Sequence, residues 1–132
     1  MIFVDSSFWI ALFLRRDLRH TDAATLMRAR DGEILVTSNH VRGETWTYLR
    51  RRAGHFWAVE FLDSLDRSRR TRVHSITPET EALALQWLRR HDERDYSFVD
   101  ATSFALMHAL AIHQALAFDC DFSAAGFVEL RA

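Results

Sequence analysis

The amino-acid sequence predicts a single α/β domain whose central sheet is largely parallel. Short β-branched and aromatic runs alternate along the chain with longer segments that have the periodicity of helices. The 132 residues, 48% of them hydrophobic, are enough for one domain with its own core. The sequence contains no repeat, linker or low-complexity segment, so we expect residues 1–132 to form one domain.

The chain begins with a predicted strand and two helices. Residues 2–5 (IFVD) are mostly β-branched or aromatic and end on a carboxylate, which favours a short buried strand. Ser6 or Ser7 can then serve as the N-cap of a helix over residues 8–16. A second helix is expected over residues 20–30, followed by an Asp-Gly turn signal.

A second strand is predicted at residues 33–37 (EILVT). Thr37 or Ser38 can cap the helix expected over residues 39–52, which a glycine closes. Apolar residues at helical spacing predict a further amphipathic helix over residues 56–68.

The next strand is predicted at residues 72–76 (RVHSI). Thr77 and Pro78 then suit the N-cap and first turn of a helix over residues 79–90. A charged loop separates that helix from another over residues 98–112, which is almost wholly apolar.

The last elements are a strand at residues 114–119 (QALAFD), a loop at residues 120–126 and a short strand at residues 127–130. Strands that alternate with helices in this way usually pair in parallel. Ligands of open parallel sheets bind beyond the carboxyl ends of the strands. The side chains that follow the strands are therefore the first candidates for a site.

Two predicted strands end on an acid, at Asp5 and at Asp119. If these strands are neighbours, both carboxylates lie on one edge of the sheet. The alternative is that each aspartate only forms a turn or caps a helix, which is common after a strand.

Glu44 and Asp100 are two further candidates on helices. Glu44 shares a helix face with Val41 and Tyr48, although it could also be an exposed glutamate paired with an arginine. Asp100 lies three residues after Ser97, close to the capping-box spacing. A cap accounts for Asp100 locally but does not exclude a metal role.

Several carboxylates on one edge repel one another unless protons or cations intervene. Oxygen ligands without histidine partners suit Mg²⁺ or Mn²⁺ rather than Zn²⁺. Two such ions about 4 Å apart can activate a water and stabilise the leaving oxygen of a phosphodiester.

All seventeen basic residues are arginine, and this composition excludes several classes of protein. Without lysine the chain can hold neither a phosphate-binding P-loop nor a Schiff base. Receiver domains and haloacid-dehalogenase-like phosphatases share the outline of this topology, but both place a lysine near the phosphoryl group. The net charge of −1 argues neither for nor against a nucleic-acid partner.

Four segments together resemble the acidic motifs of the PIN domain, and most closely those of VapC-type toxin ribonucleases. They are MIFVDSSFWIAL, VRGETW, YSFVDATSFALM and ALAFDCDF, and they span nearly the whole chain in the family's order. The resemblance implies a three-layer α/β/α sandwich and a metal-dependent endoribonuclease that uses Mg²⁺ or Mn²⁺. It also implies hydrolysis that leaves a 5′-phosphate and a 3′-hydroxyl.

The resemblance implies specific roles for individual residues. The metal-binding and catalytic carboxylates are expected at Asp5, Glu44, Asp100 and Asp119, with Asp121 as a further metal ligand. Ser7 matches the family's hydroxyl residue after the first aspartate, and Ser103 lies one helical turn after Asp100. Arg15 belongs to an arginine cluster at the end of the first helix and is expected to contact RNA.

The partners implied by the resemblance are an RNA substrate, a VapB-like antitoxin and a second copy of the chain. The single cysteine and the lack of an apolar span favour a cytoplasmic protein without membrane contact. Two alternatives stay within the fold. One is a PIN nuclease of RNA maturation or decay that has no antitoxin, and the other is a catalytically silent interaction module.

Overall fold

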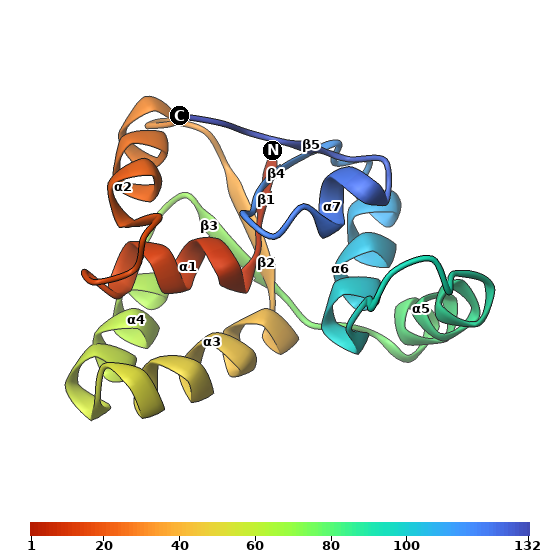
Figure 1. Cartoon of the computed structure of the whole chain (residues 1–132), viewed down its shortest axis with the longest axis horizontal. Coiled ribbons are helices and arrows are strands. Elements are labelled where there is room, and N and C mark those ends of the chain that lie inside the picture. The colour runs from red at the N-terminus through yellow and green to blue at the C-terminus, as the bar shows by residue number, and fades with distance from the viewer.

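The five strands form one sheet in the order β3-β2-β1-β4-β5, and every neighbouring pair is parallel (Figure 1). The computed structural model describes residues 1–132. The strands are β1 (Ile2–Val4), β2 (Leu35–Ser38), β3 (Thr71–His74), β4 (Gln114–Leu116) and β5 (Val128–Glu129). The chain runs outward from β1 through β2 to β3 and returns to place β4 on the other side of β1. The strand order therefore reverses between β1 and β4, where open α/β sheets bind their ligands.

Seven helices cover the two faces of the sheet and complete the predicted α/β/α sandwich. They are α1 (Ser6–Phe13), α2 (His20–Ala29), α3 (Asn39–Arg52), α4 (His55–Arg67), α5 (Pro78–Arg90), α6 (Phe98–Ala109) and α7 (Asp121–Ala124). Helices α1 to α4 lie on one face, and α5 to α7 lie on the other (Figure 1). None of the helices has the length and apolar character needed to cross a bilayer.

The start and end of α1 differ from the prediction. The N-cap is Asp5, not Ser6 or Ser7: Asp5 has extended backbone, and its side chain accepts a hydrogen bond from the Ser7 backbone N–H. The helix ends at Phe13, well before residue 16, because Leu14 turns into the core with extended backbone (φ −106°, ψ 99°). Asp5 therefore both follows the last residue of β1 and caps the first turn of α1.

The predicted loop at residues 120–126 contains a helix, α7, which the sequence did not reveal. Four residues are too few for a helical periodicity to be recognised. The predicted helix over residues 98–112 is shorter and ends at Ala109, because Ala111 adopts a positive φ of 55°. The other predicted elements are all present: α3 has its predicted bounds, and the remaining elements begin or end one to three residues from the prediction.

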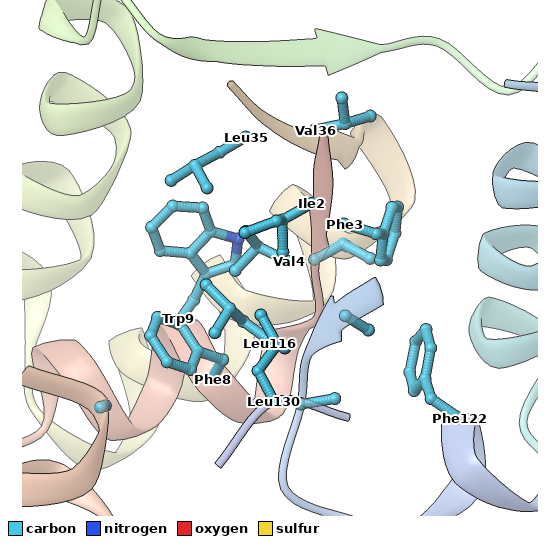
Figure 2. Packing of buried hydrophobic residues seen from close by; sticks show 14 of the residues in the cluster. Ile2, Phe3, Val4, Phe8, Trp9, Leu35, Val36, Leu116, Phe122 and Leu130 are labelled. Atoms are coloured by element: carbon cyan, nitrogen blue, oxygen red, sulfur yellow. The ribbon is translucent and has the colours of Figure 1, made fainter. Parts of the chain in front are cut away.

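The core holds β1 in the middle of the molecule. Ile2, Phe3 and Val4 are all buried, and alternate residues point to opposite faces of the sheet. Phe3 stacks on Phe122 of α7 at a centroid distance of 5.9 Å, and Ile2 points toward Trp9 of α1 (Figure 2). Burying a side chain such as Phe3 contributes about 2–3 kcal/mol. This packing fixes the carboxyl end of β1, from which the candidate site is built.

Candidate metal centre at the sheet edge

Asp5 lies at the reversal point, between β1 and α1, and is only 1% exposed. Its Oδ2 accepts hydrogen bonds from the Ser7 backbone N–H (3.1 Å) and the Ser7 hydroxyl (2.7 Å). The Ser7 hydroxyl in turn accepts a hydrogen bond from the backbone N–H of Phe118, just after β4, at 3.0 Å. Ser7 therefore ties the first carboxylate to the adjacent strand.

Asp100 lies in the first turn of α6 and is 8% exposed. The predicted capping box is confirmed: the Ser97 hydroxyl accepts from the Asp100 N–H (2.9 Å), and Asp100 Oδ2 accepts from the Ser97 N–H (3.0 Å). The Asp100 carboxylate therefore accepts a hydrogen bond from the helix start, and this bond orients it.

Asp119 lies in the turn that follows β4, and Asp121 is the first residue of α7. The Asp119 carboxylate accepts a hydrogen bond from the backbone N–H of Asp121 at 3.2 Å. Asp100, Asp119 and Asp121 each place a carboxylate oxygen within 4.8 Å of those of the other two. Two segments far apart in the sequence thus bring three acids together at the carboxyl edge of the sheet.

Glu44 lies on α3 and stands apart from that group of three. Its carboxylate accepts a hydrogen bond from the Ser6 hydroxyl, so it is linked to the start of α1. Glu44 and Ser6 line one side of a cavity of about 650 Å³ between α1 and α3, together with Tyr48, Arg51 and Arg52. The fourth predicted acid therefore faces an open, partly basic cavity.

The pKa values of three of these acids, Asp5, Asp100 and Asp119, are raised, mainly because their carboxylates are partly or fully removed from water. Burial, reinforced by the charge of Asp119, raises the pKa of Asp5 to about 8. Burial also raises the pKa of Asp100 to about 6, against the opposing effect of the Ser97 hydrogen bonds. The pKa of Asp119 is raised too, mainly by burial. Without a cation, the group holds protons that free carboxylates would have lost near neutral pH.

The donor chemistry fits a hard divalent ion. The converging side chains of Asp100, Asp119 and Asp121 offer carboxylate oxygens, and neither a histidine nor a cysteine belongs to the group. Such oxygen donors suit Mg²⁺ or Mn²⁺. A cation would compensate the charge of these carboxylates, which burial and mutual repulsion otherwise disfavour.

The three predicted supporting residues lie in different settings. Ser7 touches Asp5 directly. Ser103 is buried on α6 and donates its hydroxyl to the Val99 carbonyl, so it contacts none of the acids. Arg15 lies beyond the end of α1, with its guanidinium 5.8 Å from the Trp57 ring centroid. The arginines that line the cavity beside Glu44 are instead Arg51 and Arg52.

Sequence reasoning missed two charged residues beside the acids. Arg94 donates two hydrogen bonds, of 3.0 and 2.9 Å, to Oδ1 of Asp121. Glu129 is buried in β5 and accepts from backbone N–H groups of the turn that carries Asp121. Arg94 belongs to a charged loop with no distinguishing pattern. Glu129 could have been noticed in the sequence, because it is the one acid in the predicted apolar strand at residues 127–130.

Comparison with known proteins identifies close relatives. Residues 2–128 match the family model of the PIN domain. The chain is 54% identical over 131 residues to "23S rRNA-specific endonuclease VapC20" from two Mycobacterium tuberculosis strains, CDC 1551 and H37Rv, covering 99% of this chain and 98% of each relative. It superposes with a TM-score of 0.93 on the crystal structure of M. tuberculosis VapC20, described as a sarcin-ricin loop cleaving toxin. That match is 53% identical and covers 100% of both chains.

Proposed function

Because the chain belongs to the PIN-domain family, and within it to the VapC type, we propose that it is a metal-dependent toxin endoribonuclease. The observation that carries this proposal is the convergence of Asp100, Asp119 and Asp121 beside buried Asp5. The raised pKa values of Asp5, Asp100 and Asp119 support it, because a bound cation would favour the charged form of carboxylates that burial and neighbouring acids otherwise keep protonated.

The proposed chemistry is hydrolysis of a phosphodiester bond. Asp5, Glu44, Asp100 and Asp119, with Asp121 as a further ligand, would hold Mg²⁺ or Mn²⁺, and Glu44 would approach the ions from the side of the cavity. Bound ions of this kind supply an activated water and offset the charge that develops on the phosphate. A carboxylate of the group can accept the proton that the attacking water loses. Ser7 keeps Asp5 oriented by donating to its Oδ2.

The cavity between α1 and α3 is the proposed path of the RNA strand. Arg51 and Arg52 line it together with Glu44, so phosphate-binding and metal-binding groups lie along one surface. Tyr48 also lines the cavity, and its ring lies 5.3 Å from the Arg52 guanidinium, which helps to hold that side chain in place. Binding through such contacts weakens as salt concentration rises.

We propose 23S ribosomal RNA as the substrate and its sarcin-ricin loop as the cleavage site. Support comes from the full-length relatives, which carry this specificity in their names at 53–54% identity. The same relationship supports a VapB-like antitoxin as the partner that neutralises the enzyme, and action in the cytoplasm, where ribosomes are found. A homodimer is the oligomeric state that we expect.

The test is cleavage of ribosomal RNA by the purified, antitoxin-free protein with Mg²⁺ or Mn²⁺, compared with EDTA. Asp100→Asn and Asp119→Asn should abolish cutting. Asp63→Asn, the same change at an exposed position of α4, should leave it intact. Mapping the new 5′ ends should place a single cut in the sarcin-ricin loop.

Three results would each change part of the proposal. Cutting that survives EDTA and both substitutions would refute the metal mechanism. A discrete metal-dependent cut elsewhere would refute only the proposed substrate. A folded protein that cuts no RNA would favour an interaction module.

A further inference from the structure

Glu129 is a buried acid that the proposed chemistry does not use. It lies in β5, and its side chain is only 1% exposed. Burying a carboxylate costs free energy unless charge and hydrogen bonds compensate for it. The groups that compensate for it indicate its role.

Two of these groups are backbone N–H donors of the turn that carries the metal-site acids. Glu129 Oε2 accepts from the Ser123 N–H at 2.8 Å, and Oε1 accepts from the Cys120 N–H at 3.3 Å. Arg131 supplies the compensating charge, with a nitrogen 3.2 Å from Oε1. The Glu129 carboxylate is therefore hydrogen-bonded to the backbone on both sides of Asp121.

The hydrogen bonds to Glu129 replace the side-chain N-cap that helix α7 lacks. Cys120 is the N-cap residue of α7, and no side-chain cap bond is made there. The first N–H groups of a helix have no partner within the helix, so another acceptor must serve them. Here that acceptor is Glu129, which reaches the turn from a neighbouring strand.

The turn also has a backbone conformation that needs support. Cys120 has φ 67°, in the left-handed region, where a residue with a side chain loses about 1–2 kcal/mol. This left-handed residue separates Asp119 from Asp121, and the Asp121 N–H donates back to the Asp119 carboxylate. The bond from the Cys120 N–H to Glu129 therefore stabilises the bend that brings both acids to the group.

We propose that Glu129 is a positioning residue of the metal centre. Its carboxylate holds the turn from Asp119 to Ser123 so that Asp119 and Asp121 face Asp100. It does this without touching metal or RNA, because its oxygens are occupied by two backbone N–H groups and a guanidinium. This inference rests on the metal site of the proposed function.

Two variants separate positioning from a simple effect of charge. Glu129→Gln keeps the size of the side chain but has one acceptor oxygen for two N–H donors. Glu129→Asp keeps the charge but is shorter by one methylene, so it cannot reach both donors. Positioning predicts that both changes weaken metal binding, whereas a charge effect predicts that only Glu129→Gln does. Glu60→Gln, on the exposed face of α4, is the matched control for the loss of a carboxylate.

The experiment is Mn²⁺ titration by calorimetry, with hydrogen exchange of the backbone amides followed in parallel. Both Glu129 variants should bind Mn²⁺ about 10- to 100-fold more weakly, as is typical when a residue that orients metal ligands is lost. The Cys120 and Ser123 amides should exchange faster in both variants, and the amides of β1 should be unchanged. Glu60→Gln should behave as the wild type in both measurements.

The possible failures are distinguishable. Wild-type affinity and wild-type exchange in Glu129→Asp would overturn the inference and leave the metal site intact. If a variant does not fold, exchange in the wild-type protein still decides: unprotected Cys120 and Ser123 amides would show that Glu129 does not hold the turn. No Mn²⁺ binding by the wild type would overturn the proposed metal site, and this role of Glu129 with it.

Discussion

The pKa values of Asp5 and Asp100 are raised from the ordinary value of 3.8, to about 8 and about 6. A group whose folded pKa exceeds its unfolded pKa stabilises the fold most fully below the unfolded value. That contribution is lost as the pH rises through the folded pKa. For these two acids, the loss runs from about pH 4 upward through pH 6 and 8.

The metal-free protein should therefore lose stability as the pH rises, and Asp5 should account for much of the loss. Asp5→Asn cannot ionise, so its free energy of unfolding should fall less between pH 5 and 9. Urea unfolding in EDTA across this range measures the difference between wild type and variant. A difference that does not change with pH would contradict the raised pKa of Asp5.

Divalent cations should reverse this dependence, because they bind the ionised carboxylates and compensate the charge that destabilises the metal-free protein at high pH. The increase in Tm caused by saturating Mg²⁺ should be larger at pH 8 than at pH 6. Thermal unfolding with and without Mg²⁺ measures the increase. Asp63→Asn serves as the control and should keep the full effect, whereas Asp100→Asn should lose most of it.

Cys120 is the other residue whose local conformation matters, because its φ of 67° is unfavourable for a branched side chain. We expect Cys120→Val to be about 1–2 kcal/mol less stable than Cys120→Gly. Urea unfolding of the two variants gives this difference directly. Equal stability would mean that the turn does not keep the left-handed conformation.

At the level of elements, α1 is joined to two strands through one hydroxyl group. The Ser7 side chain donates to Asp5 at the end of β1 and accepts from Phe118 after β4. It therefore connects the two segments that meet where the strand order reverses. No other serine side chain is hydrogen-bonded to both of these segments.

Ser7→Ala should lower the free energy of unfolding by about 1–3 kcal/mol, since it leaves the Phe118 N–H without its acceptor. It should also lower kcat more than it changes KM, because Asp5 loses its orientation while Arg51 and Arg52, the basic residues of the cavity, are unchanged. Urea unfolding and cleavage kinetics test the two effects. The matched control is Ser75→Ala at an exposed position, which should change neither.

Helix α3 contributes both an acid and basic residues to one cavity, through Glu44, Arg51 and Arg52. Arg51→Gln should weaken RNA binding and reduce the slope of log K against log salt by about 1, as expected for one lost phosphate contact. Filter binding of catalytically inactive protein across salt concentrations measures the slope. Arg89→Gln, on α5 in the opposite layer, should leave the slope unchanged.

Across the whole molecule, the alternation of strands and helices was enough to predict an α/β fold with a parallel sheet, and the PIN resemblance supplied the three layers. Which strands are neighbours was left open, and the structure pairs β1 with β4, which places Asp5 and Asp119 after neighbouring strands. Local signals also identified caps such as Ser38 and Ser97, which the structure confirms. These features depend on residues close in sequence or on a regular pattern.

The features that sequence did not predict depend on contacts between distant segments. The Arg94–Asp121 pair joins a loop to the first residue of α7, 27 positions further along the chain, and no local pattern predicts that these two residues pair. Helix α7 has no N-cap side chain of its own, and its backbone is instead hydrogen-bonded to Glu129 of β5. No residue next to the helix therefore marks where it begins. The cavity beside Glu44 could not be foreseen either, because it depends on how α1 and α3 pack.

The reversal of strand order also decides when the enzyme can become active during its own synthesis. Chains leave the ribosome N-terminus first, so Asp5 is made early. Its neighbours at the reversal point, Asp119 and the strand that carries Glu129, are made last. A chain that ends before Asp119 lacks two of the five candidate carboxylates, Asp119 and Asp121, and also the strand β5. The carboxylate group therefore cannot be complete in a nascent chain until translation is nearly finished.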